Sequence, residues 1–237
     1  MDLGVEKIYV LHYTRLRDRK NRLDRMFSEH DIEVEYFLKH DQEELSKDII
    51  NDYYKDSQVD YIYKFQSLYG NQLAPYRSLN IAQISCTIKH YNCIKLVAEN
   101  CQDYGMILED DVVFNEDFVN RFNRFLSETP NDWDAIFLGC CGNLHIPQGE
   151  QHPDQVAYVV PHPASRGGDS YLLRQKMAEK ISSTMKPFTT ISDWELAYQL
   201  YHHNAKVYWW EPSLIIQGSQ NGLYNTTLDD DHHRQHL

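Results

Sequence analysis

The first 38 residues place a strand, a helix and a second strand in succession, and this order limits the folds that the chain can adopt. Residues 7–13 (KIYVLHY) are rich in β-branched and aromatic side chains, which is typical of a strand buried on both faces. Residues 16–29 carry one apolar stripe among charged residues, the pattern of a surface helix. Residues 32–38 alternate apolar and polar side chains and indicate a second strand. This spacing predicts a βαβ unit, whose two strands are parallel.

The alternation continues through the rest of the chain. The clearest helix is expected at residues 80–101, because apolar residues recur there every three or four positions and Asn80 with Gln83 resembles a capping box. Further strands are expected at residues 105–108, 133–138, 156–160, 169–173, 206–210 and 214–216, and the strand at 214–216 is expected to complete the sheet. Further helices are expected at residues 118–126, 175–185 and 193–203, and Ser192 is expected to be the N-cap of the helix at 193–203. The acidic, tyrosine-rich residues 41–65 are expected to be a loosely helical insertion. With neither a repeat nor a flexible linker, residues 1–237 are expected to form a single α/β domain with a mixed central sheet.

The charge of the chain narrows the classes of partner. Lys and Arg number 23 and Asp and Glu number 35, so the formal net charge is 23 − 35 = −12. Binding a nucleic-acid backbone requires a positive surface, so nucleic acid is excluded as the main partner, although a few local cations could hold a small phosphorylated ligand. The apolar runs are about strand length, far below the roughly 20 residues that a membrane span needs. No membrane-spanning segment is therefore expected.

The cysteine pattern and the N-terminal residues indicate the cellular compartment in which the protein is expected to reside. The chain has five cysteines, an odd number, and none of them forms a CxxC pair. This pattern argues against a disulfide framework and against a zinc cage built from cysteines. The acidic N-terminus contains only a short apolar run, which is too short for a secretory signal. We therefore expect reduced thiols in a cytoplasmic protein.

The most informative local feature is a run of three carboxylates, Glu109, Asp110 and Asp111, directly after a predicted apolar strand. Ligands of open α/β sheets bind at the carboxyl ends of the strands. Hard oxygen ligands in such a place suit Mg²⁺ or Mn²⁺, which in turn suits a diphosphate. A solvated acidic turn is the alternative. Apolar residues precede the run, and the apolar pair Val112 and Val113 follows it. This arrangement favours a ligand site.

A set of short blocks occurs in order between residues 6 and 220. The blocks are IYVLHYTRLRDR at 8–19, QISCTIKH at 83–90, LEDD at 108–111, GDSYLL at 168–173 with Ala178, Asp193 at the head of a helix, and PSLIIQ at 212–217. Together they resemble glycosyltransferase family 25, the lipopolysaccharide- and collagen-modifying galactosyl- and glucosyltransferases. Three positions depart from the family pattern, because His12 stands in place of Asn, Gln83 in place of an acid and Lys89 in place of Ser. The first and third of these leave the identity of the donor open.

The resemblance implies a GT-A-type fold, in which a Rossmann-like nucleotide-binding half and an acceptor half share one continuous sheet. The halves would be approximately residues 1–111 and 112–220, and residues 221–237 would form a C-terminal tail. The resemblance also implies a nucleotide-sugar donor, usually UDP-linked, with Mn²⁺ or Mg²⁺ at the acidic motif. A bound cation there neutralises the charge that develops on the diphosphate leaving group.

The resemblance also assigns site residues. Asp111 would be the direct metal ligand with Glu109 beside it, and Glu109 and Asp110 would contact the ribose or the water shell of the metal. The other expected donor contacts are Thr14, Arg15, Arg19, His90, Gln217 and Ser219. For Arg19 the alternative is a solvated helix face, and for His90 it is a hydrogen-bonded structural residue.

Members of the resembled family invert the anomeric carbon, which requires a base for the proton of the acceptor hydroxyl. Asp193 is the first candidate, because it heads a helix in the half of the chain where the acceptor would enter. Glu195 is the second candidate. The alternative for Asp193 is a plain acidic residue that interacts with the helix dipole, which would lower its pKa and weaken it as a base.

The sequence thus favours a metal-dependent, inverting transferase that moves galactose or glucose from a UDP-sugar to a glycan or to a hydroxylated protein side chain such as hydroxylysine. One alternative is a nucleotidyltransferase or phosphotransferase that uses the same acidic site, although the chain lacks a good glycine-rich phosphate loop. A second alternative is a non-catalytic carbohydrate- or partner-binding module. The tail histidines His232, His233 and His236 are either a late metal ligand or part of a polar tail.

Overall fold

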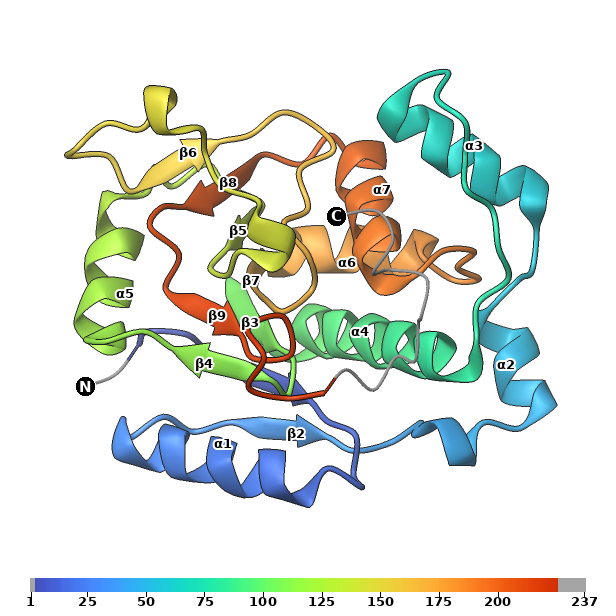
Figure 1. Ribbon diagram of the computed structural model, residues 1–237, viewed down its shortest axis with the longest axis horizontal. Coiled ribbons are helices and arrows are strands. Elements are labelled where there is room, and N and C mark those ends of the chain that lie inside the picture. The colour runs from blue at the N-terminus through green and yellow to red at the C-terminus, as the bar shows by residue number, and fades with distance from the viewer. Residues whose placement is uncertain (1–2, 226–237) are drawn as a thin grey trace.

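The computed structural model describes residues 3–225, in which a seven-stranded sheet forms the centre of the molecule (Figure 1). The strands follow the spatial order β2-β1-β3-β7-β5-β8-β6. Their bounds are β1 Ile8–Leu11, β2 Glu35–Phe37, β3 Tyr104–Leu108, β5 Ala135–Phe137, β6 Ala157–Val159, β7 Ser170–Arg174 and β8 Val207–Trp210. Strands from both sequence halves therefore share one sheet. The tail histidines 232, 233 and 236 lie outside the described residues.

The N-terminal strands are parallel, as the strand–helix–strand succession predicts. β1 pairs with β2 and β3, so that Tyr9 lies beside Glu35 on one side and beside Ile107 on the other. All four residues of β1 are buried, because helices cover both faces of this part of the sheet. The parallel arrangement brings the carboxyl ends of β1 and β3 to the same edge.

The second part of the sheet is mixed. β7 runs antiparallel to its neighbours β3 and β5, β8 runs parallel to β5, and β6 closes the edge antiparallel to β8. The predicted mixed α/β class with a mixed central sheet is confirmed. The insertion of β7 next to β3 carries residues 168–170 to the end of β3, where the acidic run begins.

Helices cover the two faces of the sheet. On one face, α1 (Arg17–Glu29) and α5 (Phe118–Glu128) contribute Leu23, Phe27, Phe122 and other apolar side chains to one buried cluster. On the other face, α4 (Ile81–Asn100), α6 (Gln175–Thr184) and α7 (Ser192–His202) contribute to a second cluster, with Ile94 and Ile181 fully buried. Short 3₁₀ turns lie at Gln42–Glu44 (η1), Cys141–Asn143 (η2) and Gln148–Glu150 (η3).

The insertion at residues 41–65 is helical, as predicted. It forms η1, α2 (Lys47–Tyr53) and the first part of α3 (Gln58–Tyr69), which lie on the outer side of α4 and α7 (Figure 1). α2 packs its apolar side chains around Phe188, and α3 places Phe65 against Trp194 of α7 with 5.4 Å between ring centroids. The insertion therefore extends the helical layer.

Two local expectations are wrong. Residues 214–216 do not complete the main sheet, because β9 (Ile215–Gln217) pairs with β4 (Val112–Phe114) in a separate two-stranded sheet. α7 begins at Ser192, with Ile191 in the N-cap position, so Ser192 is not the cap. The Ser192 hydroxyl instead donates to Asp193 Oδ1 at 3.3 Å.

The start of α4 has the predicted capping box. The Gln83 amide donates to the Asn80 side chain at 2.9 Å, and the Asn80 amide donates to the Gln83 side chain at 3.0 Å. Replacing Asn80 by alanine is expected to lower the free energy of unfolding by about 1 kcal/mol, measured by urea denaturation. Asn80→Ser should keep most of the stability, since serine is also a good cap; equal losses in both variants would show that the cap is not the cause.

Candidate functional site

A pocket opens at the carboxyl ends of β1 and β3. Its walls come from the loop after β1, the first turns of α4, the acidic run 109–111 and residues Gln217 and Ser219. The pairing of β4 with β9 positions the last two, because Val112 and Gln217 are register partners directly beyond the acidic run. The topology therefore gathers four distant segments at the edge where ligands of α/β sheets bind.

Asp110 binds the loop after β1. Its carboxylate accepts hydrogen bonds from Arg19 at 2.8 Å, from His12 Nδ1 at 2.8 Å and from the Tyr13 amide at 3.1 Å. Burial alone would raise the pKa of Asp110, but the bonds from His12 and Arg19 outweigh it and lower the pKa. With these three partners Asp110 positions the loop after β1, and it also lines the pocket, so its predicted contact with a ribose or with the water shell of a metal stays a prediction.

Glu109 and Asp111 lie on either side of Asp110 in the sequence and have a different environment. Glu109 Oε1 lies 3.1 Å from His90 Nε2, and Glu109 Oε2 accepts from Gln217 at 3.2 Å. Burial raises the pKa of Glu109 well above its usual range, and the charges of Asp111 and Asp193 add to the effect. Asp111 Oδ2 accepts from the Ser219 amide at 3.2 Å, whereas Asp111 Oδ1 is buried and accepts no hydrogen bond from residues 3–225.

Two more carboxylates, Asp169 and Asp193, approach Glu109 from other elements. Asp169 precedes β7 and is buried, and burial followed by the charge of Glu109 raises its pKa well above the usual range. Asp193 lies in the first turn of α7. A Cβ on Gly168 would lie only 2.8 Å from Asp193 Oδ1 and 3.0 Å from His90 Cε1, so glycine allows this close approach. The negative charges of the clustered carboxylates repel one another, and a bound cation would relieve this repulsion.

His90 is buried beside these carboxylates. Burial lowers the pKa of His90 to about 4, even though the charge of Asp193 acts in the opposite direction. The imidazole is therefore neutral at pH 7. Its Nδ1 lies 3.3 Å from the Tyr171 hydroxyl, and its Nε2 faces Glu109.

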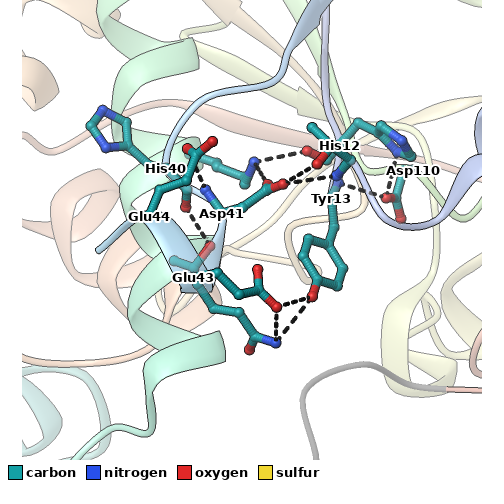
Figure 2. Close-up of polar contacts among 11 residues, drawn as sticks. His12, Tyr13, His40, Asp41, Glu43, Glu44 and Asp110 are labelled. Atoms are coloured by element: carbon teal, nitrogen blue, oxygen red, sulfur yellow. Dashed lines mark hydrogen bonds and ion pairs between the residues drawn. The ribbon is translucent and has the colours of Figure 1, made fainter. Parts of the chain in front are cut away.

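A second buried carboxylate, Asp41, holds the loop after β1 from the opposite side. Figure 2 shows Asp41 extending toward the segment of His12 and Tyr13. Lys89 donates to Asp41 Oδ1 at 2.7 Å and to the His12 carbonyl at 2.8 Å, and the Thr14 amide donates to Asp41 Oδ2 at 3.1 Å. The Lys89 and Asp41 side chains are each 4% exposed, so they form a buried ion pair between α4 and the start of η1. The pocket wall is therefore preorganised by two buried carboxylate–cation pairs, Asp41–Lys89 and Asp110–Arg19.

The donor-side candidates from the sequence separate into two groups. Arg19, His90, Gln217 and Ser219 lie at the pocket or bond to its carboxylates. Thr14 is bound to Asp41, and Arg15 is 67% exposed and paired with Glu43. Neither Thr14 nor Arg15 belongs to the pocket wall.

The position of Glu195 does not suit a base that takes the proton of an acceptor hydroxyl. It is fully buried, and both of its carboxylate oxygens accept from Lys64 of α3 at 2.7 Å. Gln199 donates to it at 3.0 Å. These contacts make Glu195 an anchor between α3 and α7, and we do not retain it as a candidate base.

The sequence analysis did not assign Asp169, Asp41 or Cys86 to the site. Asp169 had a signal, since it stands in the GDSYLL block, directly after two glycines and at the start of an apolar run. Asp41 had none, because its partner Lys89 is 48 residues away.

Comparison with known proteins identifies the family. The model of glycosyltransferase family 25, described as an LPS biosynthesis protein family, matches residues 5–196. The chain belongs to glycosyltransferase family 25. The resemblance expected from the ordered motifs is therefore confirmed.

Relatives of this family 25 chain include insect and vertebrate proteins. A glycosyltransferase 25 family member of Aedes aegypti is 31% identical over 140 residues, which cover 58% of this chain and 21% of that protein. Human procollagen galactosyltransferase 2 is 22% identical over 182 residues, which cover 76% of this chain and 28% of that protein. The chain thus spans about a quarter of the length of these relatives.

Among solved structures, a glycosyltransferase involved in glycosylation of the major capsid of PBCV-1 is similar with a TM-score of 0.44 and 11% identity, over 90% of this chain and 94% of that one.

The three departures from the family 25 pattern are each accommodated by the structure. His12 donates to Asp110, and Lys89 donates to Asp41. Gln83 completes the capping box of α4, a role that glutamine fills as well as glutamate. Among residues 3–225 the charge of Lys89 is therefore paired with Asp41, whereas His12 Nε2 is buried and has no hydrogen-bond partner.

Proposed function

We propose that this family 25 chain is a metal-dependent, inverting glycosyltransferase that moves a hexose, galactose or glucose, from a UDP-sugar to a glycan or a hydroxylated protein side chain. The observation that carries the proposal is the environment of Asp111 at the end of β3. Its Oδ1 is buried and accepts no hydrogen bond within residues 3–225, and the neighbouring Glu109 carboxylate has a strongly raised pKa. A carboxylate in this state favours a cation partner.

The donor set fits a hard divalent cation. Asp111 and Glu109 would hold Mn²⁺ or Mg²⁺ through carboxylate oxygens, the ligands that these ions prefer. When bound, the cation would neutralise charge on the diphosphate of the donor. Arg19 is bound to Asp110 and keeps a positive charge beside the pocket, and Gln217 and Ser219 hold the last strand pair over the carboxylates.

The acceptor base in this proposal is Asp193. Inversion is a direct displacement, in which the acceptor oxygen forms a bond to the anomeric carbon, the bond from that carbon to the diphosphate breaks, and the hydroxyl proton moves to a base. Asp193 heads α7 beside Gly168 and its charge acts on Glu109. Asp169 is the other carboxylate of the cluster from the acceptor half, but it is 1% exposed, whereas Asp193 is only partly buried and is the better placed to meet an acceptor.

UDP with Mn²⁺ is expected to raise the melting temperature of the protein. At a UDP concentration about 100 times the dissociation constant, ligand binding adds about 2.7 kcal/mol of stability. For a chain of this size that corresponds to a shift of roughly 5–10 °C, measured by differential scanning fluorimetry. Asp111→Ala should abolish the shift, whereas Asp154→Ala, which changes an exposed aspartate, should retain it.

Two results would contradict parts of the proposal. If UDP produces the same shift in the presence of EDTA, metal dependence is wrong. If the protein binds glycans but turns over no UDP-sugar across a panel of acceptors, the chain is a binding module; turnover of a nucleoside triphosphate would instead indicate a nucleotidyltransferase or phosphotransferase.

A further inference from the structure

A second group of side chains that could hold a metal ion, Cys86, His90 and Glu109, lies at the pocket. Cys86 and His90 are four residues apart on α4, so their side chains share one face of the helix. Glu109 faces them from the end of β3. One ligand atom of each residue, a sulfur, a nitrogen and an oxygen, lies within 4.8 Å of the other two.

The spacing of these atoms is close to that of a tetrahedral zinc site. Ligand atoms at zinc bond lengths of 2.0–2.3 Å are about 3.3–3.8 Å apart at the corners of a tetrahedron. His90 Nε2 and Glu109 Oε1 are 3.1 Å apart, and Cys86 Sγ lies within 4.8 Å of a ring nitrogen of His90 and a carboxylate oxygen of Glu109. Rotation of the Cys86 side chain is not opposed by a strong bond, since its contact to Ser192 Oγ is 3.9 Å long.

The chemistry of the three ligands differs from that of the proposed Mn²⁺ site. A thiolate and an imidazole select borderline cations, whereas Mg²⁺ and Mn²⁺ prefer oxygen ligands. The neutral imidazole and the thiolate are the forms that bind a metal, and His90 presents Nε2 to the cluster, 3.1 Å from Glu109 Oε1. Metal binding must therefore release the thiol proton of Cys86 to solvent.

We propose that Cys86, His90 and Glu109 bind Zn²⁺, with the fourth coordination position open toward the pocket. Cys86 and Glu109 both belong to the pocket wall, so a small ligand or water can reach that position. The absence of CxxC pairs argues against a cage of four cysteines, and the mixed site would be of the open kind with three protein ligands. Because Glu109 belongs to both sets of ligands, Zn²⁺ and a Mn²⁺–UDP complex would compete.

Cobalt provides a direct test, because Co²⁺ substitutes for Zn²⁺ and gives a near-ultraviolet charge-transfer band only when a thiolate is a ligand. Protein freed of metal with EDTA is titrated with CoCl₂. The wild type is expected to develop the thiolate band at a one-to-one ratio and to lose it on addition of ZnCl₂. Cys86→Ser should lack the band. Cys101→Ser is the matched control and should retain the band, since Cys101 is the C-cap of the same helix, roughly 22 Å from Cys86 along its axis.

The affinity for Zn²⁺ gives a second measure. Cys86→Ser and His90→Gln are each expected to weaken Zn²⁺ binding by at least about tenfold, measured by competition with a chromogenic chelator. A measurement on the wild type avoids any effect of the substitutions on folding: ZnCl₂, but not MgCl₂, should slow alkylation of Cys86 by iodoacetamide, followed by peptide mass spectrometry.

A wild type that shows no thiolate band, or an alkylation rate of Cys86 that Zn²⁺ does not change, would overturn the zinc site. A band of equal strength in Cys86→Ser would do the same. These readouts are independent of sugar transfer. If the band forms through Cys86 while no UDP-sugar is turned over, the proposed function fails and the zinc site stands.

Discussion

Replacing Lys89 by methionine is expected to lower the free energy of unfolding by about 3–5 kcal/mol, because it leaves a buried carboxylate without its cation. Lys89 bridges Asp41 and the His12 carbonyl, and both charged side chains are 4% exposed. Methionine preserves most of the length of the side chain, so the loss arises from the missing charge and hydrogen bonds. Urea denaturation of the wild type and the variant measures the difference.

Two further variants separate the buried ion pair from a general effect of removing a lysine. Lys95→Met changes a lysine of the same helix that is 50% exposed and 3.6 Å from Glu99, and it should cost less than about 1 kcal/mol. In the double variant Asp41→Asn with Lys89→Met the uncompensated charge is gone, so the loss should be smaller than the sum of the two single losses. Additive losses, or a loss for Lys89→Met no larger than for Lys95→Met, would contradict a stabilising role of the pair.

The sequence predicted the elements whose signals are local. The 3.6-residue period and the Asn80–Gln83 box define α4, a β-branched and aromatic run defines β1, and a short apolar run defines β3. The position of the acidic run at the end of β3 was also predictable, because the run directly follows the apolar residues that form the strand. These features are encoded within a few neighbouring residues, so one sequence is sufficient to find them.

The features that the sequence did not predict depend on contacts between distant segments. Residues 214–216 have the pattern of a strand, but the pattern does not say that β9 pairs with β4 and not with the main sheet. Glu195 and Asp193 are both acids in the first turn of α7, yet only Glu195 meets Lys64, which is 131 residues away. The same limit applies to the pairing of Lys89 with Asp41.

Asp193→Asn is expected to lower the turnover of a UDP-hexose by roughly 10²–10⁴-fold while it leaves the affinity for UDP at saturating Mn²⁺ unchanged. Asp193 packs closely against Gly168, because a Cβ on that glycine would lie only 2.8 Å from Asp193 Oδ1. Asparagine has almost the same shape as aspartate, so the substitution preserves this packing. Its amide cannot accept the proton of the acceptor hydroxyl. Initial rates with saturating donor measure turnover, and the melting-temperature shift with UDP and Mn²⁺ measures donor binding.

The matched comparison is Glu195→Gln, two residues further along α7. Glu195 binds Lys64, Gln199 and Thr190 in a buried network, so its substitution should lower stability. Turnover per folded molecule should change little, because this carboxylate is fully buried and both of its oxygens accept from Lys64. The reverse result, with turnover lost in Glu195→Gln and retained in Asp193→Asn, would transfer the role of base to Glu195 and would require α7 to rearrange when the acceptor binds. A loss of UDP binding in Asp193→Asn would instead place Asp193 at the donor, since a base that acts only on the acceptor hydroxyl contributes nothing to donor affinity.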